Sequence, residues 1–456
     1  MSERPLRVAV VGSGPAGFYA ASALLTAEPP AEVDMLERLP TPWGLVRLGV
    51  APDHPKLKEV SRAFERTALR PGFRFFGNVA LGRDVTHDDL TRAYDAVVYA
   101  VGAQTDRRLG IPGEDLPGSW SATELVAWYN GHPDFQELSF DLSHERAVVV
   151  GAGNVALDVV RMLALTDEEL APTDATDRSI EAISGSGLRE LVLLSRRGPA
   201  QASFTTPELK ELGELAGADV LVDPAELDLD TASEASLATD TNARRNVEVL
   251  RGYAARTPRG ELTSIALRFC VSPTAIVGDD RVEGVEVVRN ELVARDGRIT
   301  AVPTGVTETI PCGLVFRSIG YHGIPLPGMP FDARSGTIPN DAGRILDGNG
   351  APLPGAYVAG WIKRGPTGVI GTNKKDATET VARLLEDAGS GRLRRVDADA
   401  DADAIVALLE ERGAEPVVYA GWEAIDALER SRGEPHGRPR VKLCSWDELL
   451  AAARPD

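Results

Sequence analysis

Residues 6–25 read LRVAVVGSGPAGFYAASALL, a short β-branched run that passes into a glycine-rich turn and then into a helical pattern. In such a turn Gly12 permits the tight bend, and Gly14 lets the backbone approach a pyrophosphate. Gly17 lets the following helix pack closely on the strand. The helix N-terminus offers free N–H groups to phosphate oxygens. The stretch therefore predicts a strand–turn–helix unit that binds a dinucleotide.

An acidic residue follows the second predicted strand of this unit. Val33–Leu36 ends at Glu37, which lies 20 residues after Gly17. A carboxylate at this spacing hydrogen-bonds a ribose diol and repels a 2′-phosphate. The first site is therefore predicted to prefer FAD or NAD, the alternative being a solvent-facing glutamate at a strand end.

The pattern recurs in the middle of the chain. Arg146–Val150 leads into the turn Gly151-Ala152-Gly153-Asn154-Val155-Ala156, in which alanine takes the place of the third glycine. The next predicted strand, Leu191–Leu194, ends in Arg196 and Arg197 and not in an acid. Guanidinium groups are planar, permanently charged partners for phosphate oxygens. The second site is predicted to bind NADP, unless the arginine pair is only an exposed basic turn.

The second unit departs from the usual spacing in one respect. Arg196 follows Ala156 by 40 residues, about twice the usual interval. The excess lies in 166–190, a polar stretch rich in Asp, Thr and Ser. This composition predicts a surface insertion.

A weaker repeat indicates that one nucleotide domain interrupts the other. The strand-like runs Tyr94–Gly102 and Cys312–Gly320 each end in glycine, and each closes one nucleotide-binding half. The later strand Ala356–Gly360 is expected to return to the first sheet. The predicted fold is α/β, with two Rossmann-like domains and the NADP domain inserted into the FAD domain. The boundaries are an FAD domain of 1–106 and 322–390, an NADP domain of 107–321 and a C-terminal α/β extension of 391–456.

Smaller elements complete this prediction. Ile265–Ile310 alternates through short strands, with turns at 278–280 and at Asp296-Gly297, and predicts a small β-meander. The Asp/Ala run 397–403 is a predicted linker. Beyond it, Ala404–Glu411 and Trp422–Arg430 have the periodicity of amphipathic helices.

Composition excludes several classes of protein. The 456 residues carry a formal net charge of −19, which disfavours binding to nucleic acid or to an anionic membrane. No apolar run reaches a membrane-spanning length, and no signal peptide is evident, so we expect a cytoplasmic protein without stable membrane insertion. Cys270, Cys312 and Cys444 are far apart in sequence and form no CxxC. This spacing argues against a disulfide framework, a metal site or a ligated cluster.

Two different dinucleotide sites in one chain imply that hydride passes between them. The cofactors supply the chemistry and the protein positions them, which predicts an NADPH-dependent flavoprotein reductase. One alternative is an NADPH-dependent flavin oxidase or monooxygenase that gives electrons to oxygen. A lower-ranked alternative is a noncatalytic nucleotide-binding sensor.

Four longer motifs carry a family resemblance: LPTPWGLVRLGVAPDHP (39–55), VGAGNVALDVVRML (150–163), SRRGPAQASFTTPEL (195–209) and GWIKRGPTGVIGTNKKDA (360–377). Nearly the whole chain resembles ferredoxin–NADP reductases of the adrenodoxin reductase type, in particular their mycobacterial NADPH–ferredoxin reductase branch. The resemblance implies bound FAD, NADPH as hydride donor and a ferredoxin-type iron–sulfur protein as acceptor. Haem monooxygenases would then receive the electrons.

The resemblance also implies site residues. FAD would be contacted by Ala16, Glu37, Leu45, Leu81, Trp361 and the backbone of Gly368, Val369 and Ile370. NADP would be contacted by Arg107, Ala152, Gly153, Asn154, Val155, Arg196, Arg197, Glu208 and Gly368. Leu45 and Leu81 are alternatively plain core leucines. Glu208 also fits a first-turn helix acid, and it could brace the arginine pair.

His54 and Glu211 are the remaining candidates, and the resemblance places both near the nicotinamide and the flavin. As a pair they would orient NADPH or stabilise the reduced, anionic flavin. We expect a modulating role, because direct hydride transfer needs no obligatory general base. The alternative is a structural turn histidine and an unrelated glutamate on a helix face.

An acidic ferredoxin would need a local basic patch on this acidic chain. Sequence clustering offers these candidates: Arg244, Arg245, Arg251, Lys363, Arg364, Lys374 and Lys375.

Overall fold

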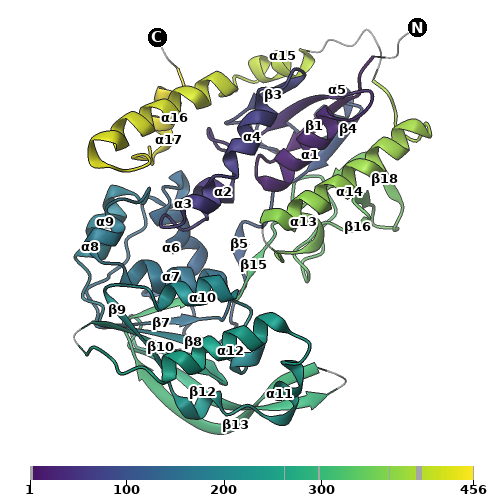
Figure 1. Ribbon diagram of the computed structural model, residues 1–456. Coiled ribbons are helices and arrows are strands. Elements are labelled where there is room, and N and C mark those ends of the chain that lie inside the picture. The colour runs from purple at the N-terminus through teal and green to yellow at the C-terminus, as the bar shows by residue number, and fades with distance from the viewer. Residues whose placement is uncertain (1–3, 261, 296–297, 369, 397–402, 455–456) are drawn as a thin grey trace.

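The computed structural model of the chain describes residues 4–260, 262–295, 298–368, 370–396 and 403–454. Figure 1 shows an upper lobe, built on segments near both termini, and a lower lobe, built on the middle of the chain. Within the described ranges, no helix combines the length and the apolar character that a membrane span needs.

The upper lobe contains a seven-stranded sheet with the order β16-β17-β18-β4-β1-β2-β3. Strands β18 to β3 run parallel, and β16 and β17 add an antiparallel edge. The strands are β1 (Arg7–Val11), β2 (Glu32–Leu36), β3 (Phe73–Phe76), β4 (Ala96–Tyr99), β16 (Asn340–Asp341), β17 (Arg344–Leu346) and β18 (Pro352–Val358). Because β18 pairs with β4, the predicted return of the chain to the first sheet is confirmed.

The lower lobe contains a second sheet of six parallel strands, with the order β6-β14-β7-β8-β10-β9. The strands are β6 (Ser119–Ser121), β7 (Arg146–Val150), β8 (Glu190–Ser195), β9 (Ala218–Val222), β10 (Thr263–Phe269) and β14 (Leu314–Arg317). The predicted strand Leu191–Leu194 lies in β8, next to β7. The predicted class, two Rossmann-like α/β units in one chain, is confirmed.

The predicted β-meander is only partly correct. Its first strand, β10, belongs to the six-stranded parallel sheet. The antiparallel sheet contains only β11 (Val271–Val277), β12 (Gly284–Arg295) and β13 (Arg298–Pro311). The predicted turn at 278–280 joins β11 to β12, whereas Asp296 and Gly297 lie outside the described residues.

The lobes are linked by a two-stranded antiparallel ribbon of β5 (Thr105–Asp106) and β15 (Tyr321–His322). Apart from two helices within residues 166–190, the described helices of the lobes are α1 (Pro15–Leu25), α2 (Leu45–Leu48), α3 (Pro55–Lys58), α4 (Ser61–Ala68), α5 (His87–Ala93), α6 (Ala122–Tyr129), α7 (Asn154–Ala164), α10 (Thr206–Leu212), α11 (Thr231–Ser236), α12 (Thr241–Ala254), α13 (Trp361–Arg364) and α14 (Ile370–Gly389). Short 3-10 turns lie at η1 (Pro133–Phe135), η2 (Pro199–Gln201), η3 (Pro224–Leu227) and η4 (Glu434–His436). The exact domain boundaries stay a prediction.

Residues 166–190 are not a simple surface insertion, so that prediction is wrong. They form α8 (Asp167–Leu170) and α9 (Asp177–Ser184), and residues 173–176 between them are buried. Asp174 pairs there with Lys58 of the upper lobe at 2.6 Å and with Lys442 of the C-terminal segment at 3.2 Å. The polar composition reflects helix caps and a buried ionic network, both of which need polar side chains.

The C-terminal segment contacts both lobes. Its helices are α15 (Ala404–Glu411), α16 (Tyr419–Gly433) and α17 (Trp446–Ala452), which confirms the two predicted helices. The described part of this extension is helical and not α/β as predicted, since its β pairing is limited to a single bridge from Val417 to Gly77. Glu429 of α16 forms a buried pair with Arg47 at 2.5 Å, and Arg438 donates to the Thr173 carbonyl of the lower lobe at 2.9 Å. Most of the predicted linker, 397–402, lies outside the described residues.

Candidate functional site

The first glycine turn lies at the carboxyl end of β1, the edge at which open α/β sheets bind ligands. A Cβ at Gly17 would stand 2.0 Å from the Gly12 carbonyl oxygen, so the third glycine is needed for the close approach of α1. At Gly14 the same position meets no described atom within 4 Å. This open space above the helix N-terminus fits the pyrophosphate of FAD.

Glu37 and Leu45, two of the predicted FAD residues, lie at this turn. Glu37 accepts hydrogen bonds from the Ser13 N–H at 2.9 Å and from the Ser13 hydroxyl at 2.7 Å. Gly44 approaches Gly14 so closely that a Cβ on Gly44 would stand 2.9 Å from the Gly14 Cα, which brings Leu45 beside the turn. Leu81 is half-buried against the apolar cluster on the other face of the sheet, which agrees with the core alternative.

Trp361 begins α13 beside the same turn. A Cβ on the preceding Gly360 would meet the Ala16 Cβ at 2.6 Å. The Trp361 ring lies 5.2 Å from the Tyr321 ring, and its buried indole N–H has no hydrogen-bond partner among the described residues. Because buried donors are normally satisfied, this orphaned N–H fits a site for a ligand acceptor.

The segment before α14 holds the last predicted FAD contacts. Gly368 has a φ of +80° and is exposed, and Ile370 is the first residue of α14. Val369 lies outside the described residues.

The second glycine turn repeats this geometry at the carboxyl end of β7. Gly151 has a φ of +144°, and a Cβ there would stand 2.1 Å from the Ser318 carbonyl oxygen. Gly153 is the N-cap of α7, with Val155 in the first helical turn. The carbonyl of Ala152 accepts from the Ser203 N–H at 2.8 Å.

Asn154 ties this turn to the loop before α10, because its side-chain oxygen accepts from the Thr205 N–H at 2.8 Å. The described residues leave the space at Gly153 open except for the Ser203 hydroxyl at 3.6 Å, which fits the pyrophosphate of NADP. Arg107 lies on the ribbon between the lobes, where its N–H donates to the Gly320 carbonyl at 3.0 Å.

Arg196 and Arg197 follow β8 and line a cavity of about 610 Å³ at the outer end of the lower lobe. Arg196 is exposed and Arg197 is half-buried. Burial and the neighbouring Arg196 lower the pKa of Arg197, as expected where two cations converge without an anion. The cavity therefore offers converging positive charge at the position predicted for a 2′-phosphate.

The predicted pair of His54 and Glu211 meets at the seam of the two lobes. His54 is the N-cap of α3 in the upper lobe, and Glu211 belongs to α10 in the lower lobe. The His54 Nε2 lies 2.7 Å from Glu211 Oε2 and 3.7 Å from Glu208 Oε2. Glu208 is a first-turn acid of α10, as the sequence suggested, but in the described structure it contacts His54 and Arg161 and not the arginine pair.

Arg161 of α7 is the centre of this cluster, and no sequence motif identified it. Its guanidinium reaches Asp53 at 2.5 Å and Asp158 at 2.7 Å. It also lies 3.3 Å from Glu208 and 3.8 Å from Glu211, although its side chain is only 2% exposed. The available signal was an arginine three residues after an aspartate inside the mostly apolar helix pattern LDVVRMLAL.

The cluster is unbalanced in charge, and the pKa values of its members shift accordingly. Burial, followed by the nearby Asp158 carboxylate, raises the pKa of Glu208 to about 7. Burial also raises the pKa of Asp158 despite the attraction of Arg161. Burial acts in the same direction on Asp53, but the hydrogen bond and the charge of Arg161, together with the charge of His54, outweigh it and lower the pKa. One guanidinium thus neutralises only part of the carboxylate charge.

A metal ion is an alternative occupant of this cluster, since ligand atoms of His54, Glu208 and Glu211 lie within 4.8 Å of one another. Arg161 already supplies a positive charge in contact with both glutamates, which disfavours a second cation. The cysteines offer no redox pair, because Cys270, Cys312 and Cys444 are free and burial raises their thiol pKa values.

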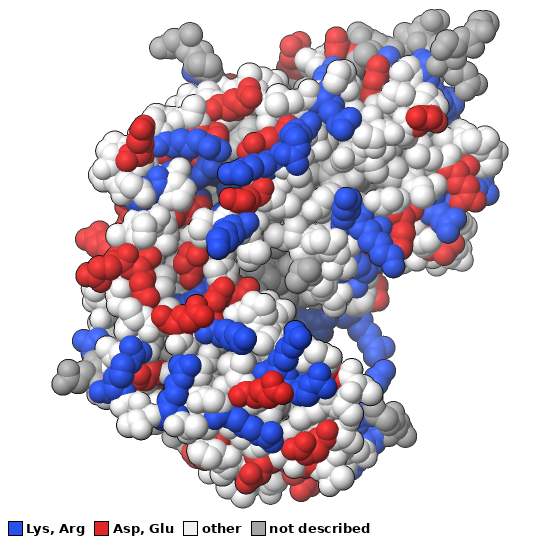
Figure 2. Space-filling view, in the orientation of Figure 1, with Lys and Arg blue, Asp and Glu red and all other residues white. Residues whose placement is uncertain are grey.

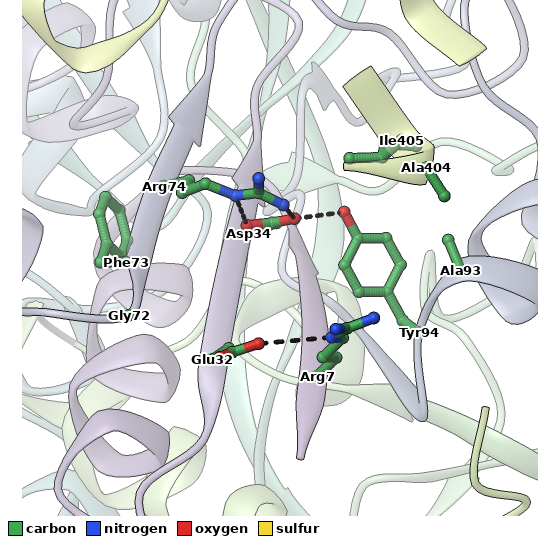
Figure 3. A pocket seen from close by; sticks show the side chains of 10 residues that line it. All are labelled: Arg7, Glu32, Asp34, Gly72, Phe73, Arg74, Ala93, Tyr94, Ala404 and Ile405. Atoms are coloured by element: carbon green, nitrogen blue, oxygen red, sulfur yellow. Dashed lines mark hydrogen bonds and ion pairs between the residues drawn. The ribbon is translucent and has the colours of Figure 1, made fainter. Parts of the chain in front are cut away.

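A further cavity, of about 280 Å³, lies at the opposite edge of the first sheet. Figure 3 shows Asp34 of β2 in its middle, between Arg74 and the Tyr94 hydroxyl. Arg74 holds Asp34 at 2.6 Å, and the Tyr94 hydroxyl donates to Asp34 at 2.7 Å. The amino ends of β1, β2 and β3 form this edge, so the cavity is separate from the two glycine turns.

The fold and the site define a class: an oxidoreductase with one dinucleotide turn in each of two Rossmann-like lobes. A family model described as pyridine nucleotide-disulphide oxidoreductase matches residues 6–184. The NADPH-ferredoxin reductase FprA of Mycobacterium tuberculosis is 54% identical over 98% of this chain and 99% of its own length. The chain belongs to the NADPH–ferredoxin reductase family of flavoproteins, whose cofactors are FAD and NADP.

Two further comparisons agree. The mitochondrial NADPH:adrenodoxin oxidoreductase of Arabidopsis thaliana is 41% identical over 99% of this chain and 96% of its own length. The solved structure of Mycobacterium tuberculosis FprA in complex with NADPH superposes with a TM-score of 0.94 and 52% identity. The superposition covers 99% of the present chain and 100% of the chain in the FprA structure. The adrenodoxin reductase resemblance is therefore confirmed.

Proposed function

We propose that this chain transfers hydride from NADPH, bound at the second glycine turn, to FAD, bound at the first. FAD when bound accepts the hydride and passes its electrons on singly, here to a ferredoxin-type iron–sulfur protein. The enzyme would act in the cytoplasm and supply haem monooxygenases. The observation that carries the proposal is the His54–Glu211 contact of 2.7 Å, because it joins the two nucleotide lobes at their seam.

In this proposal the two turns bind the pyrophosphates, and residues at the strand ends contact the ribose groups of the two dinucleotides. The backbone of Gly12, Gly14 and Gly17 cradles FAD, with Glu37 at its ribose. The turn from Gly151 to Val155 cradles NADP, with Arg196 and Arg197 at its 2′-phosphate. The proposed domain boundaries, at 106/107 and 321/322, coincide with the ribbon of β5 and β15.

Other chain segments would complete the flavin site. Trp361 would supply its indole N–H, which has no partner among the described residues, and Gly368 would offer backbone to both cofactors. Leu45 lies beside the first turn and supports an apolar contact, while Leu81 is better explained as core. Arg107, which directly follows β5 of the ribbon, would reach NADP from the seam.

We assign His54 and Glu211 a modulating role. The pair holds the imidazole in one orientation, and Arg161 fixes the second glutamate, Glu208, beside it. Fixed groups of this kind position the nicotinamide without reorganising during the reaction. If His54→Ala left both hydride transfer and electron transfer within twofold of wild type, this role would be rejected.

A first experiment follows the reduction of the purified yellow protein by NADPH and by NADH under anaerobic conditions. The proposal expects rapid bleaching with NADPH and much slower bleaching with NADH at equal concentration. A protein that carries no FAD, or that does not bleach with NADPH, would instead be the noncatalytic sensor.

The ferredoxin would dock on basic side chains beside the cleft between the lobes. Figure 2 shows Lys and Arg on both sides of the hollow that separates them. Lys363 must be removed from the predicted patch, because its ammonium lies 3.0 Å from Asp376 and is nearly buried. Arg364 is also held internally by Asn373 at 2.8 Å.

The revised docking patch therefore contains the exposed cations of α12 and α14: Arg244, Arg245, Arg251, Lys374 and Lys375. Electrostatic docking predicts that the rate of ferredoxin reduction falls as salt rises. Lys374→Glu with Lys375→Glu should lower that rate and leave flavin reduction by NADPH unchanged. If both rates fell together, the patch would not be the docking surface.

A further inference from the structure

The cavity beside the arginine pair has a second wall, which no part of the nucleotide-binding motif supplies. One wall comes from the loop after β8, with Arg196 and Arg197, and from the start of α12 at Asp240. The other wall comes from β13, where residues 298–301 and Pro303 line the cavity. In Figure 1 the hairpin of β12 and β13 lies along the outer edge of the lower lobe, below α12.

A β-bulge separates this wall from the rest of the hairpin. Val288 pairs with Thr307, but Asn290 pairs with Pro303, so residues 304–306 stand opposite Arg289 alone. Such a bulge bends a hairpin and re-aims the residues beyond it. The outer part of the hairpin, residues 290–295 and 298–303, is called the hairpin arm below.

Buried hydrogen bonds fasten the hairpin arm to the arginine loop. Asn290, which is 6% exposed, donates its side-chain amide to the Arg196 carbonyl at 2.9 Å and to the Ser272 hydroxyl at 2.8 Å. The Cys270 N–H donates to the Arg197 carbonyl at 3.1 Å. The loop carbonyls thus face the antiparallel sheet, which fixes the loop before any ligand arrives.

The cavity wall has an excess of positive charge. Arg298 is exposed, and in the described part of the chain neither it nor Arg196 forms an ion pair. Arg298 also stands directly opposite Arg295 across the hairpin, a like-charge pair that is unfavourable without an anion. Among the described residues that line the cavity, the one carboxylate is Asp240, which caps α12 by accepting from the Ala243 N–H at 2.9 Å.

We propose that Arg298 of the hairpin arm is a third arginine for the 2′-phosphate of NADP and helps to determine nucleotide specificity. The inference rests on the proposed binding of that phosphate by Arg196 and Arg197, which it deepens. The negative charge of a phosphate monoester is larger than one guanidinium group can neutralise. Its oxygens can accept hydrogen bonds from several charged donors at once. The arm and the arginine pair line the same cavity, so a phosphate bound there would lie within reach of both.

The test is equilibrium binding of 2′,5′-ADP and of 5′-AMP to the FAD-loaded enzyme, measured by isothermal titration calorimetry. The variants are Arg298→Ala and the control Arg295→Ala. The control removes the same charge from the paired position of the hairpin, but Arg295 does not line the cavity. For an exposed charge-assisted contact we expect Arg298→Ala to weaken 2′,5′-ADP binding by about 5- to 10-fold. The affinity of Arg298→Ala for 5′-AMP should stay within twofold of the wild-type value. The affinities of Arg295→Ala for both ligands should also stay within twofold of the wild-type values.

The outcomes separate this inference from the proposed function. If the wild-type protein did not prefer 2′,5′-ADP over 5′-AMP, the proposed NADPH site itself would fail. If it did prefer 2′,5′-ADP, but Arg298→Ala lost no affinity or lost no more than Arg295→Ala, only the role of Arg298 would be overturned. An equal loss for both ligands with Arg298→Ala would also overturn it, because that loss would come from a deformed pocket.

Discussion

Arg161 gives the sharpest test of the charge cluster at the seam. Replacing it by Met keeps most of the side-chain length but removes the guanidinium that contacts Asp53, Asp158 and Glu208. The side chain is 2% exposed, so water cannot take over these contacts without rearrangement. Breaking a buried ion pair by removing one partner costs about 3–5 kcal/mol of unfolding free energy.

The loss should depend on pH. Burial raises the pKa of Glu208 to about 7, so at pH 6 this carboxylate is mostly neutral and needs less compensation. At pH 8 it is ionised, and without Arg161 its repulsion by Asp158 is no longer offset. The destabilisation should therefore be about 1 kcal/mol larger at pH 8 than at pH 6, an order-of-magnitude figure for one partly ionised group.

The assay is urea unfolding of the FAD-loaded protein at both pH values, followed by flavin release and by circular dichroism. Arg161→Lys is the matched control, because it keeps a positive charge but not the planar fork, and it should recover part of the lost stability. A loss below about 1 kcal/mol, or one that is the same at pH 6 and pH 8, would refute the reasoning.

Three other predictions follow from the same structure. Replacing Arg196 and Arg197 together by Ala should weaken NADPH binding by about 30- to 1000-fold, from about 2–4 kcal/mol of charge-assisted bonding, and leave NADH use unchanged. Steady-state kinetics with both nucleotides checks this, and equal losses would show that the pair is structural. In the folded protein the raised pKa makes Glu208 hold its proton more tightly than in the unfolded chain, so the unfolding free energy of the wild type falls as pH rises from 4.5 to 7. Glu208→Gln should remove this fall, because glutamine does not titrate. The shift corresponds to about 3 kcal/mol, which solvent screening at this partly exposed carboxyl reduces. Thermal unfolding across this window should therefore show the variant more stable than wild type above pH 7 by about 2 kcal/mol, and parallel pH profiles would contradict the assignment. Asp174→Asn should cost about 3–5 kcal/mol, since it leaves the buried Lys58 and Lys442 without their shared carboxylate. Asp177→Asn, on a largely exposed side chain that pairs with Arg438, should cost less than about 1 kcal/mol in the same urea titration.

The nucleotide turns could be predicted from sequence because their geometry is local. Gly12, Gly17 and Gly151 stand where a Cβ would collide with nearby backbone, so a short contiguous motif records the requirement. The return of β18 to the first sheet was also predictable, because the buried strand patterns repeat.

The cluster around Arg161 is a different case. Arg161 and Asp53 are separated by 108 residues and meet only through the packing of two lobes, so no spacing rule links them. The meander prediction failed at β10 for a related reason. Its Ile265, Leu267 and Phe269 are buried in alternation, which is also the pattern of an antiparallel strand.

Runs of charged residues in the sequence were the least reliable guide to which side chains are buried and which are exposed. Lys363 stands in a basic run, yet its ammonium turns inward to Asp376 and to the Thr380 hydroxyl, each at 3.0 Å. Asp174 stands in an acidic, polar stretch and is buried between two lysines. A run of charged letters does not show which side chains a later segment will cover.

The most direct test of the proposed function is a double-mixing experiment. The enzyme is first reduced anaerobically with one equivalent of NADPH and is then mixed either with oxidised ferredoxin or with air-saturated buffer. The proposed electron transfer predicts that reoxidation by ferredoxin is much faster than reoxidation by air, and that it slows as salt rises. Reoxidation by air that is much faster than by every ferredoxin tested would contradict it and favour a flavin oxidase or monooxygenase.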